Sequence, residues 1–195
     1  MALLDTFKQK VLDLGRSEAR AKARPLLDGD EVFDRSAAGL DRRNQESFVL
    51  FWLLSDRALF IVAGGRPEDH AYRIPYEAVI EIALDFDENE EFLPWYVRLA
   101  LHGEGRGEIT TLADDGATTG NPLAPPRAGP VSSDERGRLA RGELVPLTGF
   151  AALPKKFRSA LRRRIELSGG TLHITGEEAA ERRWARARKR SRKAG

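Results

Sequence analysis

The chain has 195 residues, 41% of them hydrophobic, which is enough for one well-buried domain with extensions rather than two domains. It has no cysteine, which excludes disulfides and thiolate chemistry, and its three histidines are scattered, which disfavours zinc. The net charge of +2 conceals a division. Residues 1–154 carry 18 basic and 26 acidic side chains (−8), whereas residues 155–195 carry 14 and 4 (+10). An acidic body with a basic end indicates that the end binds an anionic partner.

The apolar segments are too short for a membrane span. The longest run, residues 48–54, falls far short of the roughly 20 residues that a spanning helix needs. Charges interrupt residues 1–14, so this segment does not resemble a signal peptide. We therefore expect a cytoplasmic protein, with attachment to the inner face of the membrane as an alternative.

Residues 1–25 predict an amphipathic helix. Apolar residues recur at helical spacing, and Pro25 predicts an end by Arg24. The apolar stripe consists of Leu3, Leu4, Phe7, Val11 and Leu14. We expect this stripe to dock on the rest of the chain or on a second copy in a homodimer. A helix lying on a membrane, with its lysines at the headgroups, is the alternative.

Between residues 30 and 112 the pattern changes to that of strands. Runs of alternating or continuous apolar residues are separated by turn residues such as Ser55-Asp56-Arg57, the pattern of a small barrel or sandwich. The seven predicted strands cover residues 31–39, 47–54, 58–63, 71–76, 79–86, 95–102 and 108–112. We expect the last two to form a hairpin across the glycine-rich residues 103–107.

The remaining chain divides into a loop and two helices. Residues 113–147 are rich in proline, glycine and charge and poor in large apolar residues, which predicts a flexible loop. Residues 154–168 predict a helix with one apolar face that ends at Gly169-Gly170. After a short apolar stretch, residues 175–178 match a capping box that opens a last helix. This helix is basic at its end and is expected to project into solvent.

Three segments resemble parts of the pleckstrin-homology-like superfamily, especially its bacterial and GRAM-type branch. They are residues 26–32 (LLDGDEV), 54–60 (LSDRALF) and 73–82 (RIPYEAVIEI). They are similar to that branch's entry strand, its Leu-Thr/Ser-Asp-x-x-Leu hairpin and its Ile-Pro-Tyr/Leu-x-x-Ile strand pair. The resemblance covers residues 26–112 and 148–168.

The resemblance implies a mainly β fold: a seven-stranded antiparallel barrel capped by the helix at 154–168. The domain would span residues 26–168, with an amphipathic helix (1–25) before it and a basic extension (169–195) after it. The family's scaffold binds lipids, peptides or proteins without catalysis, which implies an adaptor for a protein or peptide. The basic cluster of phosphoinositide binders is lacking here, because Asp41 and Glu46 interrupt Arg35, Arg42 and Arg43.

No residue pattern predicts catalysis, a cofactor or a metal. Asp85, Asp87, Asn89 and Glu91 alternate like an EF-hand loop, but Glu90 stands at the glycine position. We expect this acidic loop to be solvated. The three histidines lie on different elements, and no serine has the context of a nucleophile. We expect a protein without enzymatic activity.

The most distinctive functional feature is the basic run from residue 182 to 193. It contains eight basic residues and one tryptophan, and we predict that it binds an anion or an acidic partner. The candidate residues are Arg182, Arg183, Trp184, Arg186, Arg188, Lys189, Arg190, Arg192 and Lys193. Anionic lipid, nucleic acid, an acidic protein surface and the acidic body of the same chain all fit, as does a solvated helix with no partner.

Overall fold

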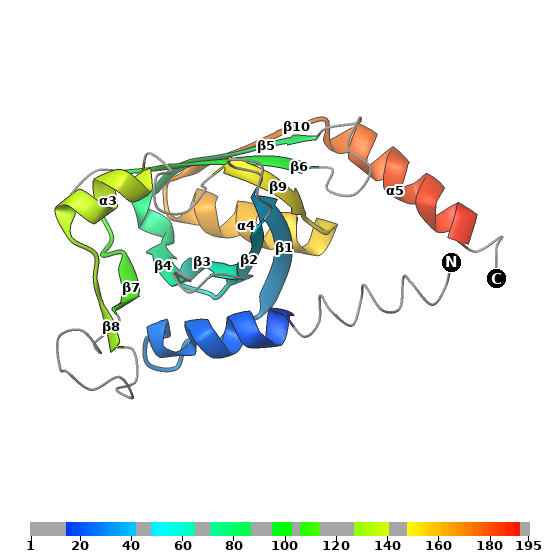
Figure 1. Cartoon of the computed structure of the whole chain (residues 1–195). Helices are drawn as coiled ribbons and strands as arrows, with labels where there is room; N and C mark the ends of the chain where they lie inside the picture. Colours follow the sequence, from blue (N-terminus) through cyan, green and yellow to red (C-terminus); the bar gives the residue numbers. More distant parts are fainter. Residues whose placement is uncertain are drawn as a thin grey trace.

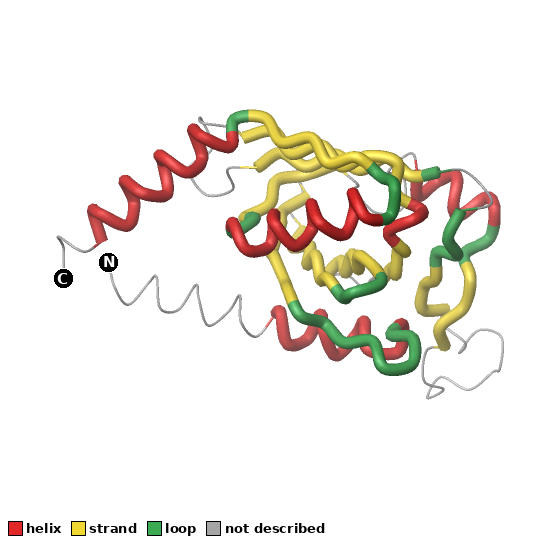
Figure 2. Tube along the Cα trace, turned by 180° about the vertical axis from the view of Figure 1, so that it is seen from behind, coloured by secondary structure: helices red, strands yellow, loops and turns green. Residues whose placement is uncertain are grey.

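The computed structural model describes residues 15–41, 48–64, 71–86, 95–102, 106–113, 127–140 and 148–191. They form a ten-stranded sheet in the order β10-β5-β6-β9-β1-β2-β3-β4-β7-β8, with helices on both of its faces (Figure 1). All neighbouring strands are antiparallel except β10 and β5, which are parallel. The sheet bends so that helix α4 lies between its two halves (Figures 1 and 2).

The prediction of a mainly β fold with helices is confirmed. Seven strands lie between residues 26 and 113: β1 (Arg35–Asp41), β2 (Phe48–Leu54), β3 (Ala58–Gly64), β4 (Ala71–Pro75), β5 (Val79–Phe86), β6 (Trp95–Leu101) and β7 (Thr110–Ala113). Three more follow: β8 (Arg127–Pro130), β9 (Thr148–Ala152) and β10 (Thr171–Thr175). Within the described ranges the first and last strands of the order, β10 and β8, do not pair, so no closed barrel is seen.

Strand β2 is almost continuously apolar because both of its faces are covered. Successive side chains of a strand point to opposite faces. Leu50, Trp52 and Leu54 belong to the core inside the bent sheet, whereas Phe51 and Leu53 belong to a second cluster on the outer face. The helix over residues 15–23 covers that outer face.

This first helix packs closely on the sheet. Ala19 and Ala23 are buried in the outer cluster, and Gly15 lies so near Phe51 that an added Cβ would come within 2.7 Å of the ring. The helix gives way to the 3₁₀ helix η1 (Arg24–Leu26), close to the predicted end at Arg24. The predicted stripe from Leu3 to Leu14 lies outside the described residues.

Helix α4 (Lys155–Leu167) confirms the predicted helix at 154–168. Its apolar residues Phe157, Leu161 and Ile165 are buried in the inner core, and this face packs against β1, β10 and the 3₁₀ helix η3 (Tyr76–Ala78). Gly169 has φ +81°, which ends the helix at the predicted position. The α4 apolar face therefore fills the concave side of the sheet.

The predicted hairpin across residues 103–107 is wrong. β6 pairs with β5 and β9, whereas β7 pairs with β4 and β8. β6 and β7 thus lie in different parts of the sheet, and Arg136 bonds to residues on both sides of the connection between them. This side chain donates to the carbonyl oxygens of His102, Arg106 and Gly107, and Gly107 has φ +65°.

The prediction that residues 113–147 form a flexible loop is wrong for residues 127–140. They contain β8 and helix α3 (Ser133–Ala140), while 114–126 and 141–147 lie outside the described residues. The order comes from a few anchors that composition does not reveal. Leu139 is fully buried in the inner core, and the Arg136 guanidinium bonds to backbone carbonyls.

Candidate functional site

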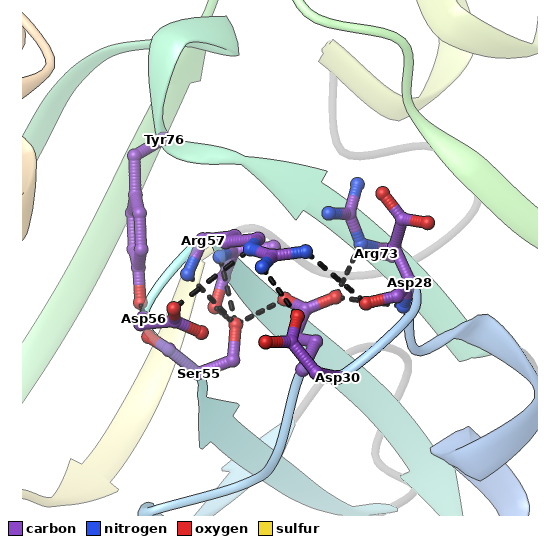
Figure 3. A network of polar contacts seen from close by, with 9 residues as sticks. Asp28, Asp30, Ser55, Asp56, Arg57, Arg73 and Tyr76 are labelled. Carbon is purple, nitrogen blue, oxygen red and sulfur yellow. Dashed lines mark hydrogen bonds and ion pairs between the residues drawn. The ribbon is translucent and has the colours of Figure 1, made fainter.

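A buried carboxylate joins three segments that lie far apart in the sequence (Figure 3). The Glu31 side chain is 0% exposed. It accepts hydrogen bonds from the Asp28 backbone N–H, the Ser55 hydroxyl and the Arg73 Nε, the last at 3.1 Å. The segment before β1, the β2–β3 turn and strand β4 therefore meet at one side chain.

Ser55 fixes the β2–β3 turn. Its Oγ accepts from the N–H groups of Arg57 and Ala58, and its backbone N–H donates to the Ala58 carbonyl at 3.0 Å. The same hydroxyl donates to Glu31. The predicted tight turn at residues 55–57 is confirmed. The Ser55 hydroxyl is buried and takes part in several hydrogen bonds, so it is a structural group and not a nucleophile.

Tyr76 closes the other side of this network. Pro75 ends β4, as its missing N–H predicts, and Tyr76 follows in η3. The Tyr76 hydroxyl donates to the Ser55 carbonyl at 2.9 Å. Burial raises the pKa of Tyr76 far above its ordinary value, so the group stays a neutral donor.

Beside this network lies an open cavity of about 740 Å³. The Arg73 side chain is 13% exposed, and its Nε is held by Glu31. The two terminal amines of Arg73 have no hydrogen-bond partner among the described residues, so they are available to a ligand in the cavity. The lining comes from six parts of the chain and includes Leu26, Asp28, Asp56, Arg57, Arg73, Tyr76, Glu77, Glu108, Thr110, Ala128 and Ser168.

The cavity has a mixed charge. Four carboxylates, Asp28, Asp56, Glu77 and Glu108, lie on its lining together with two arginines. Arg57 is largely neutralised within the chain, because it pairs with Asp30 at 2.5 Å and lies 3.8 Å from Asp56. The hydrogen bond to Asp30 raises the pKa of Arg57. Arg57 also uses both terminal amines, on the Asp28 carbonyl and on Asp30, whereas Arg73 is paired with Glu31 through Nε alone. Arg73 therefore keeps the donors with which it could bind a carboxylate, while the acidic side chains suit a basic group on the same ligand.

The predicted anion-binding residues lie on helix α5 (Glu177–Ser191), far from this cavity (Figure 1). The structure places the side chains of Arg182, Arg183, Trp184, Arg186 and Lys189. The side chains of Arg188 and Arg190 and the whole of residues 192–195 lie outside the described part of the chain. The first turns of α5 dock on the body, and the rest projects away from it (Figures 1 and 2).

A buried arginine of α4 holds the docked turns of α5. Arg158 is 2% exposed and stacks on Trp95, with 4.6 Å from its guanidinium carbon to the ring centroid. Its amines donate to the Leu153 carbonyl and to Glu181, both at 2.7 Å, and approach Glu177 at 3.5 Å. Ala180 is fully buried beside these pairs. The prediction that α5 projects into solvent is therefore correct only for its second half.

The other sequence candidates gain no support as sites. No cluster of three potential metal ligands occurs among the described residues, and of the EF-hand-like alternation only Asp85 is described. Asp85 forms an exposed ion pair with Arg98 at 3.1 Å. None of the described helices combines the length and the apolar character needed to cross a bilayer.

Sequence reasoning missed Glu31 and Arg73. Glu31 gave no signal, because it follows Asp28 and Asp30 in a charged segment. A weak signal was present for Arg73, which lies between the apolar residues Tyr72 and Ile74. Charges at such positions are paired when they are buried. Glu31 and Arg73 are 42 residues apart in the sequence, so the sequence did not indicate that they pair with each other.

Comparisons with known proteins give little guidance. No family model matches the chain, and the search of curated proteins found no match. Among solved structures, the hSac2 domain from the human phosphoinositide phosphatase Sac2 matches with 17% identity and a TM-score of 0.41, over 86% of this chain and 88% of that domain. A similarity this low assigns neither a family nor an activity.

Proposed function

We propose that the chain is a non-catalytic binding module of pleckstrin-homology-like type, acting in the cytoplasm, whose cavity beside Arg73 takes a peptide segment of a protein partner. The observation that carries the proposal is Arg73 itself. A fully buried carboxylate fixes its Nε, and its terminal amines remain available to the cavity. Such a fixed arginine suits a carboxylate, because two parallel N–H donors match two oxygens.

The cavity favours a peptide over a single small anion. Its volume of about 740 Å³ lies within the range of ligand pockets, and its carboxylates outnumber its arginines. A simple anion would be repelled by Asp28, Asp56 and Glu77. A segment with an acidic group for Arg73 and a nearby lysine or arginine for the rim satisfies both kinds of charge.

Selection from a displayed library of random peptides tests this function. The protein is the bait, and the selected peptides are titrated by calorimetry against the wild type and Ala128→Trp. Ala128 lines the cavity from β8, a different strand from the β4 residue Arg73, so the new indole adds bulk to the lining without replacing either member of the Glu31–Arg73 pair. We expect binding to weaken at least tenfold. Ala100→Trp, an exposed alanine of β6, is the matched control and should bind as the wild type does.

Arg73→Gln gives a second measurement. We expect it to weaken binding of the selected peptides that carry an acidic group. Arg98→Gln changes an exposed arginine of β6 outside the cavity lining and should leave their binding unchanged. Peptides that bind Ala128→Trp as tightly as the wild type would show that the cavity is not the site. A failure to select any peptide would count against a peptide-binding module.

A further inference from the structure

Helix α5 has two sides that differ in their contacts. Ala180 is fully buried against the body. Glu177 and Glu181 approach the buried Arg158 of α4 at 3.5 and 2.7 Å. Residues three and four apart lie on one side of a helix, so Trp184 belongs to the same side as Ala180 and Glu181. This inner side of α5 is therefore the side that packs on the body.

The opposite, outer side of α5 carries a row of cations. Arg182, Arg186 and Lys189 follow one another at spacings of four and three residues, and all three are exposed. Since an α-helix rises 1.5 Å per residue, they are spaced about 6 and 4.5 Å apart along the axis. Arg182 lies 3.5 Å from Glu178, whereas no ion pair of the other two occurs among the described residues. This outer row faces away from α4.

The docked turns of α5 hold the outer row in one direction. Arg158 is 2% exposed, and it also donates to the Leu153 carbonyl at 2.7 Å and stacks on Trp95. The second half of α5 continues the same helix and projects from the body (Figures 1 and 2). Arg183 lies over the Phe86 ring and is not part of the row. The backbone of the row is therefore in place before a partner binds, which lowers the entropic cost of binding.

The distribution of apolar side chains disfavours a bilayer as the partner of this row. A helix that lies on a membrane buries an apolar face and keeps its cations at the headgroups. Trp184 is 39% exposed, but it lies on the inner side, so a bilayer at the outer row would leave the indole on the far side of the helix. Ala185, beside the row, has a methyl group too small to anchor the helix.

We propose that the outer row of α5, formed by Arg182, Arg186 and Lys189, binds the sugar–phosphate backbone of a nucleic acid. Duplex DNA carries one negative charge about every 1.7 Å along its axis, so a straight row of cations meets several phosphates at once. Contacts to phosphates do not read the bases, so this binding is independent of sequence. The row lies far from the cavity beside Arg73, so the inference does not rest on the proposed function.

Fluorescence anisotropy with the full chain tests the outer row. The probes are labelled DNA and RNA duplexes of one sequence, titrated over a range of salt concentrations. Phosphate contacts release counterions, so the logarithm of the binding constant falls with that of the salt concentration, by about 0.9 for each contact with duplex DNA. We expect Arg186→Gln/Lys189→Gln to make this slope shallower by about 1.8 and to weaken binding more than tenfold at about 0.1 M salt.

Two further variants show whether the side of the helix matters. Arg20→Gln/Arg24→Gln removes the same charge from exposed positions on the first helix and η1, and it should lose less than about twofold. Trp184→Ala changes the inner side and should bind both duplexes as the wild type does. A loss in either variant as large as that in Arg186→Gln/Lys189→Gln would refute binding through the outer row.

Four other results would overturn the proposal. They are no binding to either duplex, an unchanged salt slope in the α5 double variant, tighter binding to phosphatidylserine vesicles than to DNA at the same salt, and competition by polyglutamate as strong as that by unlabelled DNA. The last two would assign the row to a bilayer or to an acidic protein. Ala128→Trp should keep full duplex binding, so failure of this surface and failure of the cavity are distinguishable.

Discussion

The Nε of Arg73 lies 3.1 Å from the carboxylate of Glu31, and this pair ties strand β4 to the segment that precedes β1. The Glu31 side chain is wholly buried, and Arg73 supplies the opposite charge with which such a buried group is paired. The pair connects two segments of the fold, and it also orients the terminal amines of Arg73 toward the cavity.

We expect Glu31→Gln to lower the free energy of unfolding by about 3 kcal/mol, because removing one partner leaves the other charge uncompensated. The loss falls at the lower end for buried pairs, since Arg73 borders an open cavity. Urea unfolding measures it. Asp85→Asn breaks the exposed pair with Arg98 and should cost less than about 1 kcal/mol. Equal losses in the two variants would contradict a structural role for Glu31.

Two buried tyrosines predict a loss of stability at high pH. Burial raises the pKa of both Tyr72 and Tyr76, and Glu135 raises that of Tyr72 further. An unfolded tyrosine loses its proton near pH 10, while the folded one keeps it. Their contribution to stability is therefore complete below about pH 10 and declines as the pH rises above it, by about 1 kcal/mol per unit for each tyrosine.

The double variant Tyr72→Phe/Tyr76→Phe tests this linkage. At pH 8 it should be less stable than the wild type, because it loses the hydrogen bonds to Glu135 and to the Ser55 carbonyl. Between pH 10 and 12 its unfolding free energy should fall less steeply. Parallel curves for the two proteins over that interval would show that neither tyrosine governs the alkaline transition.

Leu139 of α3 tests whether the segment between β7 and β9 is part of the core. We expect Leu139→Ala to destabilise by about 2–4 kcal/mol, because its side chain is fully buried among inner-core residues. Leu167→Ala makes the same change at a helix position that is 77% exposed and should stay within about 0.5 kcal/mol of the wild type. Thermal unfolding of both variants provides the comparison.

Two C-terminal truncations separate the docked part of α5 from the projecting part. A chain that ends at Arg186 keeps Ala180, Glu177 and Glu181, and its stability should be nearly unchanged. A chain that ends at Gly176 leaves Arg158 buried without its acidic partners and should lose about 3 kcal/mol. Similar melting temperatures for the two truncated chains would contradict the anchoring role of Arg158.

Sequence patterns predicted the strands whose two faces are covered. The run from residue 48 to 54 alternates between two apolar clusters, so every position had to be apolar, and the Ser55-Asp56-Arg57 turn follows from local hydrogen bonding. The helix at 154–168 was equally visible, because Phe157, Leu161 and Ile165 share one face. These signals are local in the sequence.

The missed elements depend on contacts between distant residues. β8 and α3 are short and polar, and they are held by Leu139 and by hydrogen bonds from Arg136 to carbonyls about 30 residues earlier. No strand was expected at residues 148–152, where β9 forms, because its Thr-Gly-Phe-Ala-Ala sequence lacks a strong β pattern. The Glu31–Arg73 pair and the pairing of Arg158 with Glu181 could not be predicted either, because their partners are 42 and 23 residues apart in the sequence.

The position of β9 between β6 and β1 sets an order of events during synthesis. Leu40 of β1 pairs with Phe150 of β9, and Trp95 of β6 pairs with Ala151. The two halves of the sheet are thus joined only after residues 148–152 have left the ribosome. Until then β1 and β6 each present an open edge, which makes nascent chains liable to pair with one another. Closure of such distant contacts is slow, so folding of the whole sheet should follow the synthesis of β9 rather than accompany that of β1 to β7.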